Sequence, residues 1–475
     1  VTLTKASFND FHGRIEHDKI KLWAVIEKSG EKTTGRRIME VIEQSVETFR
    51  DLRGVKEIGD SGIQQVPQIF VQNEKVKISE SVKAQQIPTV DLNGLEGDRH
   101  TEILQKIANA CETWGFFQFR GLLWKMMAAA GRFNEEAIEE KMKYYSRDPS
   151  RFINYAPGFN MNKSQKVEWK DSIRILYAPH SLDPSEWPSA LREEGIEYYK
   201  HIRLMSKILL TLVSKALSLP PNYLVETTKC MSRQNFCINF YPPCPQPELT
   251  LGTSSHSDPG SITILFQDQV RGLQVCKEDN WFAVDPIPGA FVVNVGDHLE
   301  ILSNGRFKSV EHRAVNNFGH SRISIAMFFT PLVEESANIG PIPELLQKGN
   351  PAKYREISYS EYMKNFWNTH NRHKGFLNLV GSLPKNSFDS MLSNLDDESI
   401  SSDRGQISGS ASNLHMLAIS EVLKSKLDYI GDHRRGPIAR QEGLEWTEGT
   451  DVADIEPSWL ADRVSQCESW SSDML

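Results

Sequence analysis

The chain has 475 residues, which is enough for two or three domains or for one large domain with extensions. Hydrophobic residues make up 39% and charged residues 24%, so a sizeable buried core is possible and global disorder is excluded. No run approaches about eighteen apolar residues and the formal charge of −8 leaves no basic footprint, so we expect neither a membrane span nor a nucleic-acid partner.

Residues 1–85 predict a leader made of a helix followed by an arm. Between positions 34 and 50, apolar residues recur at helical spacing, from Ile38 to Phe49. The following stretch contains short apolar groups separated by Gly and Pro, as in Val66-Pro67. We expect this leader to pack against a core that later segments form.

Residues 86–230 predict an N-terminal domain that is mostly helical. The expected elements are a short strand at 87–92, an amphipathic helix at 99–113, a buried aromatic strand at 114–119, a helix that starts near Met126, a strand at 169–177 and a long helix at 188–217. Pro220 and Pro221 end the long helix, because proline lacks the N–H that a helix needs and its ring clashes with the preceding turn.

From position 231 to 333 the hydrophobic period becomes that of strands. Apolar and polar residues alternate at 261–266, and two strand-like runs at 272–276 and 281–284 flank a polar turn typical of a hairpin. Further strands are expected at 291–295, 310–315 and 322–329. Several short strands at regular spacing predict a β-sandwich or barrel.

The rest of the chain divides at about residue 380. Residues 334–380 predict a C-terminal helical region with one helix at 358–369. Residues 381–475 hold 8 Lys and Arg against 17 Asp and Glu, a balance of −9, so the preceding residues sum to +1. The stretch at 393–412 is rich in Ser, Asp and Gly, which is typical of a linker. We therefore expect 381–475 to be an acidic, partly disordered tail of unknown role.

Three residues in the strand-rich region have the character of metal ligands. His256 and Asp258 are two positions apart, so on a strand both side chains would leave the same face, and His312 would come from a distant strand brought alongside. Two imidazoles and one carboxylate form the 2-His-1-carboxylate facial triad, which holds Fe(II) and leaves open positions. Each residue alone has a simpler explanation, such as a surface pair or a structural histidine, but their combination favours a metal site.

Four segments resemble the plant Fe(II)- and 2-oxoglutarate-dependent oxygenases, the family that contains flavonol synthases and the homologues of aminocyclopropane-carboxylate oxidase. They are Asn239-Phe240-Tyr241-Pro242, His256-Ser257-Asp258, Glu311-His312-Arg313 and Arg322-Ile323-Ser324. The resemblance extends over residues 35–370. It implies a mainly β fold with flanking helices, built around a double-stranded β-helix, or jelly-roll, core like that of isopenicillin N synthase. On this view, 231–333 is the oxygenase core.

The resemblance also implies a reaction. Fe(II) would be held by His256, Asp258 and His312, with 2-oxoglutarate and O2 as cosubstrates and ascorbate as a stimulant. A small plant metabolite would be hydroxylated or desaturated while 2-oxoglutarate is decarboxylated to succinate and CO2. No catalytic residue beyond the iron centre is implied. The ligands must lose their protons to bind metal, so metal affinity is expected to fall in acid.

Four further residues are implied to bind 2-oxoglutarate. Arg322 can grip its distal carboxylate through two parallel hydrogen bonds, and Ser324, on the same strand face, can add a hydroxyl donor. Tyr241 and Asn239 belong to the segment that contacts the cosubstrate in the family. From the residues alone, Tyr241 could equally be a core aromatic, and Asn239 fits a turn or a sheet edge better than direct contact.

Other interpretations stay open. An aminocyclopropane-carboxylate oxidase proper would use ascorbate in place of 2-oxoglutarate, and a binding or regulatory protein could keep the fold without turnover. The second is favoured by the tail and by 120–125, where the chain departs from the Asn-His-Gly of the family. A zinc hydrolase fits the ligand types but leaves Arg322 and Ser324 unexplained.

Residues outside the motif are expected to be structural. We expect Asp297, which follows Gly296, to cap a turn, and His298 and His320 not to bind metal. The six cysteines show no C-x-x-C pair and no dense framework, which favours a reduced, cytoplasmic protein. We expect a monomer whose partner is a small-molecule substrate.

Overall fold

The structure is a computed structural model of the chain, and it describes residues 54–76, 86–121, 124–146, 148, 151–157, 167–178, 182–332, 338–346 and 349–368. The chain divides into two compact units, Val1–Ser382 and Leu383–Leu475, and the second lies outside the described residues. The predicted helix at 34–50 and the linker at 393–412 also lie outside them. The acidic tail therefore stays a prediction.

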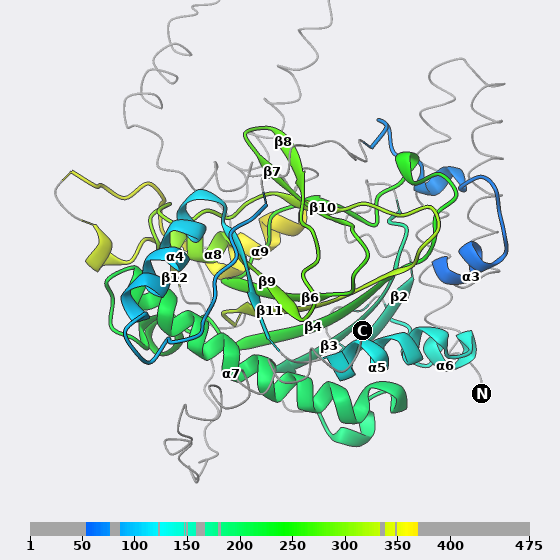
Figure 1. Ribbon diagram of the computed structural model, residues 1–475, viewed down its shortest axis with the longest axis horizontal. Coiled ribbons are helices and arrows are strands. Elements are labelled where there is room, and N and C mark those ends of the chain that lie inside the picture. The colour runs from blue at the N-terminus through cyan, green and yellow to red at the C-terminus, as the bar shows by residue number, and fades with distance from the viewer. Residues whose placement is uncertain are drawn as a thin grey trace, which may run out of the picture. The chain divides into compact units, whose positions relative to one another are not determined.

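The described part of the leader packs on the core through a short helix, α3 (Val55–Asp60), and a 3-10 turn at Gln68–Phe70 (Figure 1). The first two backbone N–H groups of α3 each donate to the carboxylate of Asp171 at 2.9 Å, which satisfies amides that have no partner within the helix. Phe70 packs edge-on against the buried ring of Trp169, with 4.9 Å between ring centroids. This packing agrees with the expected docking of the leader.

Helices of the N-terminal half share one apolar core with the large sheet (Figure 1). They are α4 (His100–Thr113), α5 (Trp124–Glu135), α6 (Ile138–Met142) and α7 (Arg192–Ala216). The long helix begins a few residues later than predicted, because its first part forms a separate 3-10 turn at Ser189–Leu191. Another 3-10 turn lies at Pro184–Glu186, and a π-helical turn at Tyr223–Thr227 follows the prolines.

The large sheet has seven strands in the order β1-β9-β6-β11-β4-β3-β2, and every neighbouring pair is antiparallel. Its strands are β1 (Phe116–Arg120), β2 (Ile153–Pro157), β3 (Asp171–Ala178), β4 (Arg233–Tyr241), β6 (Ile262–Gln267), β9 (Ala290–Val295) and β11 (Arg322–Thr330). Strands that are far apart in sequence alternate across the sheet, as jelly-roll connections require.

A second antiparallel sheet has the order β5-β10-β7-β8. Its strands are β5 (Thr253–His256), β7 (Leu273–Lys277), β8 (Asn280–Ala283) and β10 (His312–Ala314). The predicted hairpin joins β7 to β8 through Glu278 and Asp279, both with positive φ (50° and 59°), as a tight two-residue turn requires. The two sheets form the jelly-roll core, and the predicted fold class is confirmed.

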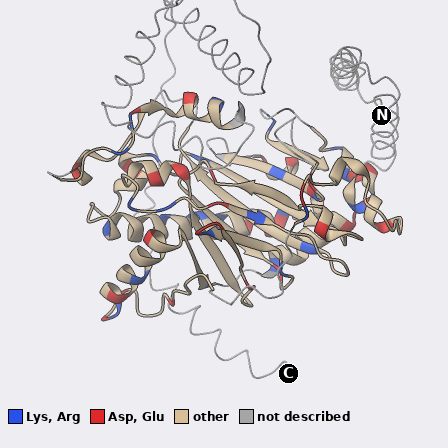
Figure 2. Cartoon of the chain, turned by 90° about the horizontal axis from the view of Figure 1, so that it is seen from above, with Lys and Arg blue, Asp and Glu red and all other residues tan. Residues whose placement is uncertain are grey.

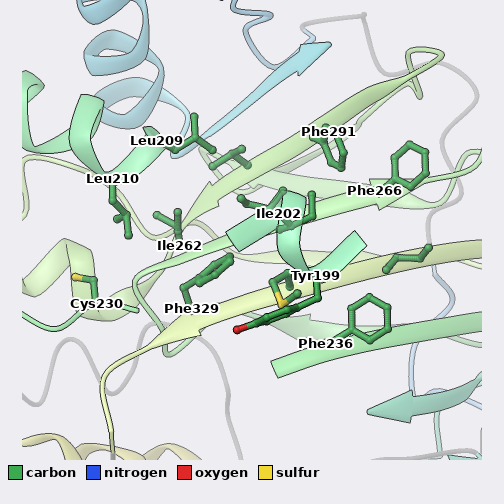
Figure 3. Close-up of a cluster of buried hydrophobic side chains, with 14 of the residues drawn as sticks. Tyr199, Ile202, Leu209, Leu210, Cys230, Phe236, Ile262, Phe266, Phe291 and Phe329 are labelled. Atoms are coloured by element: carbon green, nitrogen blue, oxygen red, sulfur yellow. The ribbon is translucent and has the colours of Figure 1, made fainter. Parts of the chain in front are cut away.

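Side chains of the large sheet alternate between two environments. Ile262, Ile264 and Phe266 belong to the core that the sheet shares with the helices, where Ile202 and Leu209 of α7 also lie (Figure 3). The side chains of Thr263 and of Gln267, which follows Phe266, extend from the opposite face of the strand and are also buried. The period of two was predicted for this strand, but burial on both faces makes its polar positions interior ones.

The remaining elements close the oxygenase unit. They are α8 (Asp297–Leu302), β12 (Asn338–Ile339), β13 (Ile357–Ser358), α9 (Tyr359–Asn368) and 3-10 turns at Pro247–Leu249 and Pro343–Leu345. The predicted helix at 358–369 corresponds to α9. Among the described residues, no helix combines the length and the apolar character needed to cross a bilayer.

The strand predicted at 87–92 is reduced to a single parallel bridge between Thr89 and Gln118. The backbone N–H of Val90 donates to the Gln118 carbonyl at 2.7 Å, but the chain then turns away. Asp91 causes the turn, because its side chain accepts a hydrogen bond from the backbone N–H of Asn93 at 3.0 Å. The strand prediction was therefore wrong in extent.

Candidate metal centre

The structure brings His256, Asp258 and His312 together inside the jelly roll. His256 is the last residue of β5, and His312 opens β10 and pairs with it directly in the antiparallel ladder. One ligand atom from each of the three residues lies within 4.8 Å of the other two. Asp258 lies beyond the end of β5, so the loop after the strand, and not the strand face as expected, aims this carboxylate at the histidines.

Both imidazoles are oriented through their Nδ1 atoms. Nδ1 of His256 lies 2.8 Å from the carbonyl oxygen of Ser254, and Nδ1 of His312 lies 3.1 Å from that of Val310. A carbonyl oxygen only accepts, so each Nδ1 carries the proton and each Nε2 presents a lone pair. The Nε2 atoms lie 3.5 Å and 3.8 Å from Oδ1 of Asp258. This arrangement is the one in which backbone partners orient metal-binding histidines.

The carboxylate of Asp258 has one occupied and one available oxygen. Oδ2 accepts hydrogen bonds from Oγ1 of Thr263 at 2.5 Å and from Nδ2 of Asn294 at 2.8 Å. Oδ1 faces the two histidines. Burial opposes ionisation of this group, but the neighbouring His312 and His256 and the Thr263 hydroxyl outweigh it and hold the pKa well below its usual range. Asp258 is therefore ionised and offers a single oxygen to a cation.

His312 is held in its neutral form. Burial and the nearby His256 lower its pKa to about 4, against the opposing effect of Asp258. The two imidazole rings lie 4.3 Å apart between centroids, and the ring of Phe116 packs edge-on against His312 at 5.3 Å. A neutral imidazole beside an ionised carboxylate is the protonation state that divalent metals need. These residues therefore fit an Fe(II) ion.

Arg322 lies in the same interior with unmet hydrogen-bonding capacity. Its side chain is 1% exposed, and Nη2 donates to Oε1 of Gln267 at 2.8 Å. Nε and Nη1 are buried and have no hydrogen-bond partner among the described residues. The guanidinium carbon lies 5.0 Å from the ring centroid of Tyr241. A buried cation with two unpaired N–H groups fits a carboxylate, because leaving such donors unpaired is costly.

The other predicted cosubstrate residues lie on β11 with Arg322 or on its neighbour β4. The hydroxyl of Tyr241 lies 3.5 Å from that of Ser324, and both side chains are buried. Asn239 lies in the ladder between Ser172 and Ser324, and its Oδ1 accepts from the Ser172 hydroxyl at 2.8 Å. The expectation that Asn239 occupies a turn or a sheet edge was therefore wrong, since β4 is an inner strand of the sheet.

The residues expected to be structural differ in their roles. Asp297 is the first residue of α8 and makes no cap; it is a buried carboxylate whose Oδ2 accepts from the hydroxyls of Ser257 at 3.1 Å and Tyr362 at 2.5 Å. His298 is buried with Nδ1 at 2.8 Å from Oγ of Ser261, and His320 is exposed. Neither histidine lies in the metal-binding group.

Sequence reasoning missed the residues that support these groups. Thr263 and Asn294 hold Asp258, and Gln267 holds Arg322. Gly272 leaves room for Arg322, since a Cβ there would lie 2.6 Å from its Cδ. The available signal was a polar residue on an otherwise apolar strand, as with Asn294 at 291–295, but that signal does not say what the residue contacts.

Comparisons with known proteins show which family the chain resembles. The model of the 2OG-Fe(II) oxygenase superfamily matches residues 229–331. A second family model, described as the N-terminal region of non-haem dioxygenases in morphine synthesis, matches residues 87–190. A 1-aminocyclopropane-1-carboxylate oxidase homolog from Solanum lycopersicum is 38% identical over 340 residues, covering 68% of this chain and 93% of that protein. A homolog from Arabidopsis thaliana is also 38% identical and covers 70% and 92%.

Solved structures give the same result. The crystal structure of JOX2 in complex with 2OG, Fe and JA superposes with a TM-score of 0.61 at 32% identity, covering 70% of this chain and 98% of that one. The dioxygenase for auxin oxidation in rice has a TM-score of 0.53 at 25% identity, covering 62% and 100%.

The fold and the His–Asp–His group define a non-haem iron oxygenase. The chain belongs to the 2OG-Fe(II) oxygenase superfamily, alongside the plant aminocyclopropane-carboxylate oxidase homologues. It is an oxidoreductase that uses Fe(II) and 2-oxoglutarate. This membership sets aside the zinc hydrolase and the non-catalytic protein that the sequence had left open.

Proposed function

We propose that His256, Asp258 and His312 hold Fe(II), and that Arg322 grips the distal carboxylate of 2-oxoglutarate. The observation that carries this proposal is the pair of buried, unpartnered nitrogens of Arg322 on the sheet that also holds Asp258 in place. Bound Fe(II), with 2-oxoglutarate and O2, supplies the oxidising power to hydroxylate or desaturate a substrate while 2-oxoglutarate yields succinate and CO2.

Each side chain of the site has a separate proposed role in binding the metal or the cosubstrate. The three side chains would hold Fe(II) and would leave room on the ion for other donors. Thr263 and Asn294 occupy Oδ2 of Asp258, so that carboxylate would bind through Oδ1. The guanidinium of Arg322 neutralises the far carboxylate. Tyr241 and Ser324 add hydroxyl donors there, and Asn239, which pairs with Ser324 in the ladder, lies beside them on the strand of Tyr241.

Replacing Arg322 tests the proposal. Arg322→Ala should raise the 2-oxoglutarate concentration needed for half-maximal succinate release by about 10- to 100-fold, because a hydrogen bond to a charged group contributes about 1.5–3 kcal/mol. Iron content, measured on the purified protein, should stay at the parent level. Arg306→Ala is the matched control, since Arg306 is an exposed arginine paired with Glu112 at 2.7 Å. An unchanged 2-oxoglutarate requirement in Arg322→Ala would refute the assignment.

The proposed substrate is a small plant metabolite. Support comes from relatives: JOX2 was crystallised with JA, and the rice enzyme is named for auxin oxidation. A screen of plant metabolites with iron-loaded protein, scored by substrate-dependent succinate release, identifies the compound. An ascorbate-dependent oxidase would instead form product with ascorbate and without 2-oxoglutarate, so omitting each compound in turn checks the cosubstrate.

The wider proposal is a monomeric, cytoplasmic enzyme that binds neither nucleic acid nor membrane. Among the described residues, Cys111, Cys230, Cys237 and Cys244 are free thiols, which supports a reducing compartment. Basic and acidic residues are interspersed along the described elements (Figure 2). We also keep the proposed division into a leader (1–85), a helical domain (86–230), an oxygenase core (231–333), a helical region (334–380) and the tail (381–475).

A further inference from the structure

A buried ion pair lies next to the proposed cosubstrate site, just before β3. Nζ of Lys170 lies 3.0 Å from Oε2 of Glu168, and the two side chains are 10% and 3% exposed. Burying two charges costs free energy that their attraction only partly returns, so such a pair indicates a role beyond stability. The proposed function gives this pair no role.

Lys170 begins a chain of hydrogen bonds that ends at the cosubstrate residues. Its Nζ donates to Oγ1 of Thr253 at 3.0 Å. Oγ1 of Thr253 lies 3.2 Å from the hydroxyl of Tyr241, which in turn lies 3.5 Å from the hydroxyl of Ser324. Strand β5 supplies Thr253, β4 supplies Tyr241 and β11 supplies Ser324, so the chain connects both sheets.

The direction of these hydrogen bonds follows from Lys170. Burial opposes its charge, but Glu168 outweighs burial and keeps the pKa of Lys170 raised, so the amine stays an ammonium. An ammonium has three donors and no lone pair, so Thr253 must accept from it. The hydroxyl proton of Thr253 is then available to the Tyr241 oxygen, and a Tyr241 that accepts it keeps its own proton for an acceptor in the Arg322 pocket.

The carboxylate of Glu168 connects the Lys170–Glu168 ion pair to the proposed metal site. Its Oε1 accepts from the backbone N–H of Ser254 at 2.8 Å. The carbonyl of Ser254 accepts from Nδ1 of His256 at 2.8 Å. One buried carboxylate therefore neutralises Lys170 and also holds the backbone that orients a proposed iron ligand.

We propose that Lys170 is a positioning residue that makes Thr253 donate to Tyr241 and so leaves the hydroxyl protons of Tyr241 and Ser324 to point toward the distal carboxylate of 2-oxoglutarate. The proposal rests on the proposed function, because it requires the carboxylate to lie at Arg322. A carboxylate accepts only, so a hydroxyl that faces it with a lone pair repels it, whereas an aligned hydroxyl donates to it. Alignment before binding also removes the cost of ordering these groups when 2-oxoglutarate arrives.

The first test interrupts the chain and leaves the ion pair in place. Thr253→Val is close in shape but lacks the hydroxyl, so the dissociation constant of 2-oxoglutarate for the iron-loaded protein should rise by about 2- to 10-fold, the effect of one hydrogen bond. Thr253→Ser, which restores a hydroxyl, should return the affinity toward that of the parent. The iron dissociation constant should not change, and kcat at saturating 2-oxoglutarate should stay close to the parent value.

The second test removes the cation. Lys170→Met leaves the buried Glu168 carboxylate without its counter-charge and is expected to destabilise the fold, so Lys170→Met/Glu168→Gln is the informative variant. This double variant should weaken 2-oxoglutarate binding. Adding Thr253→Val to it should weaken binding little further, because without Lys170 the hydrogen-bonded hydroxyls are no longer oriented. If Thr253→Val lowers the 2-oxoglutarate affinity of the double variant as much as it lowers that of the parent, the proposal is overturned.

The outcomes separate this proposal from the proposed function. If Arg322→Ala weakens 2-oxoglutarate binding and Thr253→Val does not, the hydroxyl chain has no role and only the present proposal fails. If Arg322→Ala has no effect, the proposed function itself fails. If Thr253→Val lowers iron affinity as much as 2-oxoglutarate affinity, its role is structural and the proposal is overturned.

Discussion

At the scale of single residues, the site depends on which atoms are already occupied. Nδ1 of each histidine donates to a backbone carbonyl, and Oδ2 of Asp258 accepts from Thr263 and Asn294. The two Nε2 atoms and Oδ1 of Asp258 are therefore the atoms that remain unoccupied, and they converge. Arg322 likewise donates to Gln267 through one nitrogen, and its other two nitrogens have no hydrogen-bond partner among the described residues. Residue types for metal and carboxylate binding were readable in the sequence, but their occupied atoms were not.

Gly272 leads to a prediction about the position of Arg322. A Cβ at Gly272 would lie 2.6 Å from Cδ and 2.8 Å from Nε of Arg322, closer than real side chains approach. Gly272→Ala should therefore displace the guanidinium and raise the dissociation constant of 2-oxoglutarate by about 10-fold or more, a loss within the range for a hydrogen bond to a charged group. Titrating 2-oxoglutarate into iron-loaded protein measures the effect.

The control for this variant is Gly319→Ala. A Cβ at Gly319 meets nothing within 4 Å, so its binding constant should match that of the parent. Iron content should be the same in both variants, because neither glycine contacts the metal-binding group. Parent-like affinity in Gly272→Ala would mean that Arg322 can shift without loss, and the argument from close approach would fail.

At the scale of elements, α9 supports the loop that carries Asp258. Tyr362 of α9 donates to Oδ2 of Asp297 at 2.5 Å, and Ser257 donates to the same oxygen at 3.1 Å. The backbone N–H of Asp297 donates to the carbonyl of Asp258 at 2.7 Å. Tyr359 adds a bond to the carbonyl of Pro259 at 3.3 Å. A helix outside both sheets thus holds the loop between the first two proposed ligands and β6.

Removing the Tyr362 hydroxyl tests this support. Tyr362→Phe keeps the ring and leaves the buried Asp297 with one hydrogen bond fewer, which should lower the free energy of unfolding by about 1–3 kcal/mol. Iron should also dissociate faster, because the loop loses one of its anchors. Urea unfolding and the rate of iron loss to a chelator measure the two effects.

Tyr354→Phe is the comparison. Tyr354 donates to Oε1 of Glu300 at 2.8 Å, so its loss should also destabilise the protein, but the Glu300 carboxylate accepts from Tyr354 and Ser309 and not from the loop that carries Asp258. Iron loss should therefore match the parent. Equal rates of iron loss in both variants would show that α9 stabilises the fold without supporting the loop.

At the scale of the whole molecule, protonation of His298 should oppose folding in acid. Burial lowers the pKa of His298 to about 3, whereas in the unfolded chain an imidazole titrates near its ordinary value of about 6.5. Between these values the unfolded chain binds more protons, so the free energy of unfolding falls as the pH is lowered from about 6.5 toward 3. From pH 7 to pH 5 this single group should remove about 2 kcal/mol.

Urea unfolding of the metal-free protein at pH 7 and pH 5 checks this. Asp171 and Asp297 act in the opposite sense, because burial raises the pKa of each to about 6 and the folded state then gains protons first. The difference between the parent and His298→Gln isolates the histidine, since both keep the two carboxyl groups. An identical loss in the two proteins would show that His298 does not carry the effect.

Local pattern determined much of this molecule. Hydrophobic periodicity, proline stops and the turn at Glu278 and Asp279 depend on neighbours in the chain, so α4, the β7–β8 hairpin and β11 were predictable. The motif with His256, Asp258, His312 and Arg322 was also readable, because its residue types are chemically distinctive. The resemblance of its segments to a known family indicated the reaction class.

Only the tertiary structure decided what those residues contact. Asn239 was placed at an edge and lies inside the sheet, and Asp297 was expected to cap a turn and is a buried carboxylate, because strand order and helix docking set their neighbours. The pairing of Lys170 with Thr253, and the space that Gly272 leaves for Arg322, join segments that lie 83 and 50 positions apart. Contacts between distant segments depend on the packing of the two sheets, which no local pattern records.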